Sequence, residues 1–156
     1  MKWRKWLENW DMTNLKLKTP FLEMEWNPAE PDRDAAWELY IELLTRITTQ
    51  RLSNQDGDEK TALDSVYSIF AVTRTIIKSH GRDCIEFTKL AIVVLNQVIR
   101  PFTAKWHKVS IETGFKDKEV CGKFREDLMC LQELLRTYTK MLADMAGVED
   151  LTELEQ

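Results

Sequence analysis

The chain has 156 residues, a length typical of a single domain and sufficient to bury one sizeable core. Hydrophobic residues make up 44% and charged residues 31%, and the 5 Gly and 4 Pro are too few for the many tight turns of an all-β fold. The net charge of −4 argues against a generally basic nucleic-acid-binding protein, so DNA is not an expected partner. A local basic patch is compatible with this charge, and RNA stays a candidate partner.

Cofactor and membrane signals are absent from the sequence. The three cysteines, Cys84, Cys121 and Cys130, lack CxxC spacing and fall at helical positions beside apolar residues, which favours buried reduced thiols over disulfides or a zinc site. The acidic residues do not form the Glu-x-x-His pairs of a di-iron site, so we expect no metal and no cofactor. Because no apolar run reaches the length of a membrane span and the start lacks the apolar stretch of a signal peptide, we expect a cytoplasmic protein.

Tryptophans dominate the first ten residues. Trp3, Trp6, Leu7 and Trp10 have the spacing i, i+3, i+4, i+7, which predicts a short amphipathic helix over residues 2–10. Its apolar side has three candidate destinations: a partner chain, the protein's own helices, or a membrane surface. The membrane is the least favoured, because so short a helix buries little area and acidic neighbours dilute its charge. If the partner chain is the destination, Trp3, Trp6, Leu7 and Trp10 are the candidate partner-binding residues.

The segment that follows has a different pattern. Residues 15–18 and 22–26 alternate apolar and charged side chains with a period of two, which favours extended chain. The prolines within residues 27–32 end this pattern, since a residue before proline avoids the helical region. We therefore expect residues 1–31 to form an arm that lies along the core.

Two predicted helices come next. Asp32 is placed to cap a helix whose apolar stripe continues to about Leu52, and residues 53–58 form a polar turn. The second helix begins near Asp58 and ends at His80, where the following glycine suits a left-handed residue. Both of its flanks are apolar, so we expect other helices to contact it from two sides.

The third predicted helix runs from about residue 83 to 109 and contains a proline. Pro101 removes one hydrogen bond, which would free the carbonyl of Gln97, and it disfavours helical geometry at the preceding residue. Continuation beyond Pro101 keeps Phe102 and Trp106 on the apolar side of the helix. The sequence therefore favours a kinked helix over two separate ones.

The fourth predicted helix runs from about residue 117 to 146 and ends at Gly147, and the acidic residues 148–156 are expected to fray as a tail. Amphipathic helices joined by short connections indicate an all-α protein. We expect an antiparallel four-helix bundle over residues 32–147.

A polar row lies along the third predicted helix. Asn96, Arg100, Thr103 and His107 have the spacing i, i+4, i+7, i+11, which places them along one edge. Such a row could act on a phosphate, recognise a ligand or partner, or form a solvated helix face without chemistry.

Arg100 and His107, separated by six residues, resemble the arginine-x(4–6)-histidine motif of HEPN-domain ribonucleases. Arg74 and His80 also match, but their spacing places them on different sides of a regular helix. The resemblance implies that the histidine and arginine act on the scissile phosphate and the 2′-hydroxyl of RNA, with two copies meeting across a dimer. Pro101 departs from the family, which often has a polar residue there.

A second resemblance is carried by residues 94–107 together with residues 32–40. These phrases are similar to a small helical bacterial family associated with defence or conflict systems. The resemblance implies a bacterial source and a role that depends on a partner, and it assigns no residue a function.

Two functional hypotheses follow. The first is a non-enzymatic interaction protein that acts through a protein partner or as a homo-oligomer, with the tryptophan-rich segment as one contact surface. It is favoured because the sequence contains no phosphate-binding loop, dinucleotide-binding turn or nucleophile elbow. The alternative is a metal-independent ribonuclease whose catalytic residues are Arg100 and His107.

Overall fold

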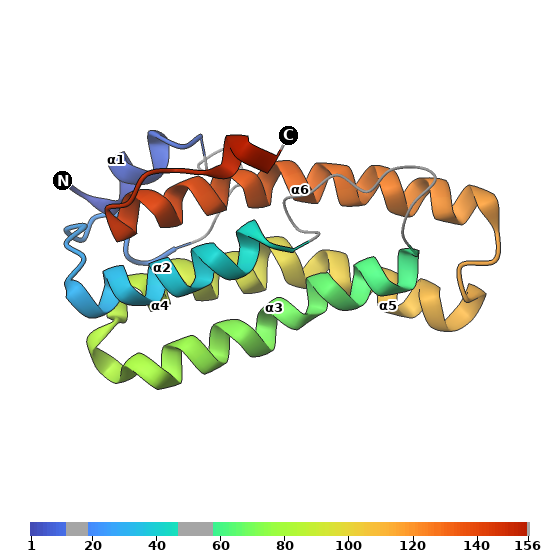
Figure 1. Cartoon of the computed structure of the whole chain (residues 1–156), viewed down its shortest axis with the longest axis horizontal. Coiled ribbons are helices and arrows are strands. Elements are labelled where there is room, and N and C mark those ends of the chain that lie inside the picture. The colour runs from blue at the N-terminus through green and yellow to red at the C-terminus, as the bar shows by residue number, and fades with distance from the viewer. Residues whose placement is uncertain (12–18, 47–57, 156) are drawn as a thin grey trace.

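The computed structural model describes residues 1–11, 19–46 and 58–155, and this part of the chain is all-helical (Figure 1). The helices are α1 (Trp3–Glu8), α2 (Glu30–Leu44), α3 (Glu59–His80), α4 (Ile85–Val94), α5 (Arg100–Thr113) and α6 (Lys118–Ala146). The longer ones lie along the long axis of the molecule, and α2 contacts α3, α4 and α6. No helix within the described residues is long and apolar enough to cross a membrane.

The limits of α3 and α6 agree closely with the sequence prediction. The side chain of Asp58 accepts a hydrogen bond from the backbone N–H of Thr61 at 3.0 Å and begins α3. The hydroxyl and backbone N–H of Thr61 hold the pKa of Asp58 below its ordinary value. Asp117 caps α6 in the same way through the N–H of Glu119, and Gly147 ends that helix with a φ of 71°.

Helix α2 differs from its prediction at both ends. It begins at Glu30, so Asp32 is its third residue and not the cap that we expected. Proline is well tolerated in a first helical turn, where a missing N–H costs nothing, and Pro31 lies there. The helix ends at Leu44, short of the predicted end near Leu52. Three predictions lie outside the described residues: the last part of this helix, the turn over residues 53–57 and the extended chain of residues 15–18.

The interruption predicted at Pro101 takes the form of a π-helical turn that precedes the proline. Leu95–Ile99 form this turn between α4 and α5, and the N–H of Arg100 donates to the carbonyl of Leu95. A π-helical turn holds one more residue than an α-helical turn, so it rotates everything that follows. Pro101 then falls in the first turn of α5, and both Phe102 and Trp106 are buried, as the sequence predicts.

The C-terminal tail does not fray as expected. The N–H of Leu151 donates to the hydroxyl of the buried Tyr40 at 2.6 Å, and Thr152 is buried at the start of a 3-10 turn, Thr152–Glu155. Lys140 on α6 pairs with Glu153 at 2.9 Å. The acidic composition of the tail suggested solvation, but a hydroxyl on α2 binds its backbone.

The N-terminal segment is part of the hydrophobic core. The predicted amphipathic helix is present as α1, and both Trp3 and Phe21 are buried. Backbone hydrogen bonds from Trp3 N to Met24 O at 3.0 Å and from Trp26 N to Met1 O at 2.7 Å hold α1 against residues 21–26. That segment is mostly turn. Its Glu25 forms an isolated antiparallel bridge with Lys2, just before α1, so the extended chain predicted for residues 22–26 is limited to this point.

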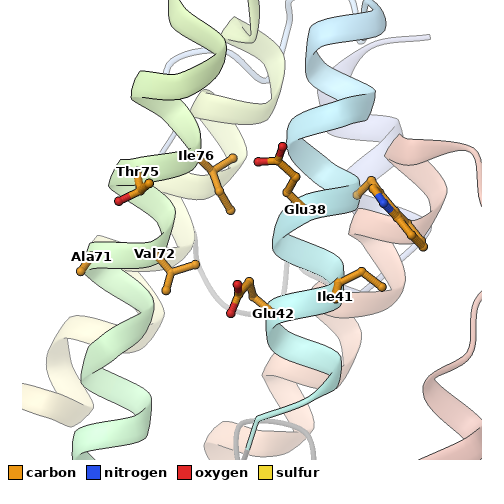
Figure 2. Close-up of a pocket in the computed structure, with 8 residues that line it drawn as sticks. Glu38, Ile41, Glu42, Ala71, Val72, Thr75 and Ile76 are labelled. Atoms are coloured by element: carbon orange, nitrogen blue, oxygen red, sulfur yellow. The ribbon is translucent and has the colours of Figure 1, made fainter.

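A groove lies between α2 and α3 (Figure 2). Its volume is about 550 Å³, within the range of sites that bind ligands or peptide side chains. The residues that line it are Trp37, Glu38, Ile41, Glu42, Ala71, Val72, Thr75 and Ile76.

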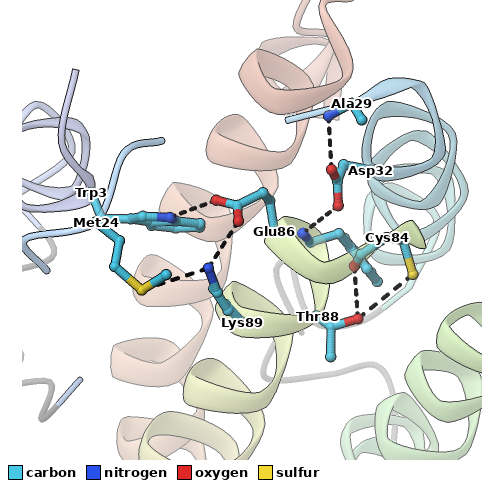
Figure 3. A network of polar contacts seen from close by, with 9 residues as sticks. Trp3, Met24, Ala29, Asp32, Cys84, Glu86, Thr88 and Lys89 are labelled. Atoms are coloured by element: carbon cyan, nitrogen blue, oxygen red, sulfur yellow. Dashed lines mark hydrogen bonds and ion pairs between the residues drawn. The ribbon is translucent and has the colours of Figure 1, made fainter. Parts of the chain in front are cut away.

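A buried carboxylate connects the first turns of α2 and α4 (Figure 3). Asp32 is 1% exposed, and its two oxygens accept hydrogen bonds from different backbone segments. One oxygen accepts from the N–H of Ala29 at 2.8 Å, and the other accepts from the N–H of Phe87 at 2.9 Å. Asp32 therefore satisfies one N–H group that precedes its own helix and one in the first turn of α4.

A second carboxylate on α4 binds the N-terminal segment (Figure 3). Glu86 accepts a hydrogen bond from Trp3 Nε1 at 2.7 Å and pairs with Lys89 at 2.9 Å. The ammonium group of Lys89 also lies 3.9 Å from the sulfur of Met24. These contacts position α1 and residues 21–26 against α4.

Replacement of Asp32 with alanine tests how much these helix starts depend on the buried carboxylate. Asp32→Ala leaves the N–H of Phe87 buried without its acceptor, so we expect a loss of about 3 kcal/mol in the free energy of unfolding. Asp34→Ala, at an exposed position of the same helix, is the control and is expected to cost less than about 0.5 kcal/mol. Urea denaturation followed by circular dichroism measures both; equal losses would contradict the role of Asp32.

Candidate functional site

The apolar side of the tryptophan-rich helix packs within the chain. Trp3, Trp6 and Leu7 are at most 2% exposed, which agrees with the second of the three destinations considered, the protein's own helices. The indole N–H of Trp6 donates to Asp144 on α6 at 2.8 Å, as that of Trp3 does to α4. Buried indoles with satisfied N–H groups stabilise a core. Trp10 is half-buried and packs against the same core.

The polar row is divided between surface and interior. Asn96 and Arg100 are exposed, and Arg100 Nε donates to the side-chain oxygen of Asn96 at 3.1 Å. Thr103 is buried, with its hydroxyl within 3.4 Å of the carbonyl of Ile99 and 3.2 Å of that of Arg100. The four residues do not lie on one line, and Thr103 is on the side of the helix that faces the core. Only part of it is therefore available to a ligand.

Arg100 and His107 each contact an aromatic ring of α3. The guanidinium carbon of Arg100 lies 4.9 Å from the ring centroid of Phe70, and the His107 ring lies 4.8 Å from that of Tyr67 in an edge-to-face arrangement. Because the two residues are separated by two turns of the regular helix α5, they are about 10 Å apart along its axis. The ribonuclease activity suggested for this pair stays a hypothesis.

The second arginine–histidine match is separated as its spacing predicts. His80 Nε2 lies 3.1 Å from Glu38 Oε1 on α2, without the alignment of a hydrogen bond, whereas Arg74 is exposed on α3. His80 therefore belongs to the end of the groove between α2 and α3.

The groove combines acidic and apolar walls (Figure 2). Glu38 and Glu42 point from α2 toward Val72 and Ile76 on α3. On the α2 side, Trp37 and Ile41 are 43% and 37% exposed, a large exposure for apolar side chains that line a groove. An exposed apolar patch beside polar groups is typical of an interaction surface.

Each of the two glutamates of the groove lies against a basic side chain. Glu38 approaches His80, and Glu42 pairs at 2.7 Å with Arg46, which lies just beyond the end of α2. Both carboxylates are nearly half exposed, so they remain accessible to a cation from outside the chain.

The described residues contain no group of three or more His, Cys, Asp or Glu side chains that could hold a metal ion.

The prediction that all three cysteines are buried is wrong for Cys130, which is exposed, while Cys84 is buried and Cys121 is half-buried. Desolvation raises the pKa of Cys121, whose sulfur lies 3.1 Å from the carbonyl of Phe115. Burial therefore makes the Cys121 thiol less reactive.

Sequence reasoning missed the groove, although a signal for it exists. Trp37 and Ile41 have the spacing i, i+4, yet they lie outside the apolar stripe that packs α2 into the core. A second apolar pair on a helix indicates a second contact.

The chain matches no family model, no curated protein and no solved structure with which it was compared.

The contrast between two tryptophans tests whether the N-terminal segment belongs to the core. Trp3→Ala removes a fully buried indole and leaves Glu86 without one partner, so we expect it to lower the free energy of unfolding by about 4 kcal/mol. Trp37→Ala, in the exposed groove wall, is expected to cost less than about 1.5 kcal/mol. Chemical denaturation measures the difference, and a Trp3 variant as stable as the wild type would show that α1 is dispensable for folding.

A second pair of variants separates packing from surface chemistry on α5. Trp106 is 2% exposed, donates to Asp127 at 3.1 Å and meets Phe124 edge to face, so Trp106→Ala is expected to cost about 3 kcal/mol. Arg100→Ala is expected to cost less than about 1 kcal/mol because Arg100 is exposed. Similar losses in guanidinium denaturation would identify Arg100 as a structural residue.

Proposed function

We propose that this all-helical chain is an antiparallel four-helix bundle that acts as a non-enzymatic interaction protein. Its docking site is the groove between α2 and α3, and the occupant is an amphipathic helix of a partner protein that carries basic residues. The observation that carries this proposal is the exposure of Trp37 and Ile41 beside a groove of about 550 Å³.

The shape of the groove favours a helix as the occupant. Two neighbouring helices form its walls, and the side chains of Val72 and Ile76 on α3 point into it (Figure 2). An amphipathic helix can insert apolar residues at i, i+3 and i+4 into such a groove. Ala71 and Thr75, which are small, leave room for the inserted side chains.

Charge complementarity indicates the polar face of the partner helix. Asp34, Glu38 and Glu42 recur every four residues along α2 and therefore share one face. Arg46 offsets one of these charges through its pair with Glu42. The remaining negative potential favours a partner with lysine or arginine, which would also approach faster under electrostatic steering.

The same charges disfavour a second copy of the chain as the occupant. In a two-fold symmetric dimer the same surface meets itself, so the α2 carboxylates of one copy would approach those of the other. Like charges brought together at an interface weaken it. Self-association is therefore the less favoured form of the proposed interaction.

A synthetic helix tests this proposal without knowledge of the natural partner. The probe is a fluorescein-labelled amphipathic peptide with leucine on one face and lysine on the other, and the matched peptide carries glutamate in place of lysine. We expect the lysine peptide to bind in fluorescence anisotropy. Glu38→Lys should weaken its binding on the order of tenfold by charge reversal. Val72→Trp should abolish binding because the indole fills the groove.

Glu126→Lys is the matched control, since it makes the same charge change at an exposed position of α6. It should leave the affinity within about twofold, and thermal melting of each variant checks that the fold is intact. Equal binding of both peptides would contradict the proposal. Concentration-dependent dimerisation that Val72→Trp abolishes, without peptide binding, would identify a second copy as the occupant.

A further inference from the structure

Negative charge is unevenly distributed in this acidic chain. Of its 156 residues, 26 are Asp or Glu, yet residues 65–82 and residues 87–111 contain neither. The two stretches include most of α3 and nearly all of the α4–α5 helix. Their basic residues are lysines and arginines together with both histidines of the chain. Carboxylates from outside the stretches approach His80, Lys89 and Lys105, so the unpaired positive charge of this region lies on other residues.

These two stretches meet in the structure. Helix α3 contacts α5, and two ring contacts join them: Tyr67 with His107 at 4.8 Å, and Phe70 with Arg100 at 4.9 Å. Tyr67 and Phe70 also contact each other, with ring centroids 5.6 Å apart. The exposed ring of Tyr67 and the exposed guanidinium of Arg100 therefore lie next to each other, with His107 beside the first and the buried ring of Phe70 beneath the second.

Two arginines on this surface have no acidic partner in the part of the chain that the structure describes. Neither Arg74 nor Arg100 forms an ion pair with any carboxylate among the described residues, and both are exposed. Arg74 follows Phe70 by one helical turn, which places it on the side of α3 that borders α5. The hydrogen bond to Asn96 uses only Nε of Arg100, so its terminal nitrogens can donate to a ligand.

The exposed aromatic ring distinguishes this surface from a simple basic patch. Tyr67 is 53% exposed, whereas the neighbouring ring of Phe70 is 4% exposed. The edge contact with His107 orients the ring and leaves area open to solvent. A ring held in this way can stack on a planar group, and arginines nearby can bind the phosphates on either side of that group.

We propose that the surface formed by Tyr67, Arg74, Arg100 and His107 binds single-stranded nucleic acid. Arg74 and Arg100 bind backbone phosphates, and Tyr67 stacks on one unpaired base. RNA and DNA single strands share this chemistry. A duplex does not, because its bases are stacked on one another and unavailable to Tyr67. This site lies on the opposite flank of α3 from the groove proposed for the partner helix and does not depend on it.

The surface has room for a short strand only. Asp64 and Glu112 mark where carboxylates reappear on α3 and α5, and Asp64 is already paired with Lys60 at 2.7 Å. A few nucleotides span such a distance, which is at the lower end of the site sizes of single-strand-binding folds. Weak, salt-sensitive binding is therefore expected.

Fluorescence anisotropy with labelled oligonucleotides tests the proposal. The probes are a single-stranded RNA of about 10 nucleotides, a DNA of the same sequence and the corresponding duplex, at about 50 mM salt. We expect a single strand to bind at least tenfold more tightly than the duplex. The double variant Arg74→Gln/Arg100→Gln should bind at least tenfold more weakly and reduce the slope of log K against log salt by about 1.4, because each phosphate contact in a single strand contributes about 0.7.

Tyr67→Ala should weaken binding of the single strand about tenfold without changing the salt slope, since stacking involves no counterion release. The matched control is Lys5→Gln/Lys118→Gln, which removes two exposed positive charges elsewhere and should change the affinity less than threefold. Absence of binding at low salt, equal binding of single strand and duplex, or equal effects of the two double variants would overturn the proposal. Circular dichroism confirms that each variant is folded.

Discussion

The arrangement of the helices depends on one buried carboxylate. Asp32 accepts hydrogen bonds from the N–H groups of Ala29 and Phe87, and both groups lie at helix starts. Burial of a charge is costly unless hydrogen bonds and favourable dipoles replace its hydration. The positive ends of α2 and α4 provide such dipoles. The same interaction therefore satisfies the helix termini and fixes how the beginning of α4 sits against α2.

The two ends of the chain complete the core that this arrangement begins. The indole groups of Trp3 and Trp6 reach Glu86 and Asp144, which are 83 and 138 residues away in sequence. At the other end, the hydroxyl of Tyr40 binds the backbone of the C-terminal tail. Contacts of such long sequence separation form only after the chain has closed large loops, which costs entropy. Both termini thus stabilise the finished fold more than its early stages.

The parts of the structure that could be predicted from sequence are those determined by nearby residues. The start of α3 at Asp58 and the end of α6 at Gly147 follow from capping chemistry, which acts within a few positions. Amphipathic spacing identified α1, but it cannot tell whether an apolar face meets the same chain or another. The two rings that contact Arg100 and His107 lie on a different helix, so no pattern within residues 94–107 reveals them.

The π-helical turn Leu95–Ile99 determines which residues of α5 face α3. Its extra residue rotates α5 by about 100° relative to a continuous α-helix. Without that rotation, Arg100 and His107 would move away from Phe70 and Tyr67, while the helix itself would stay intact. Deletion of a single codon in this turn would therefore act as a rotation of α5 about its own axis. Which side chains form this surface therefore depends on the number of residues in the π-helical turn as well as on the sequences of α3 and α5.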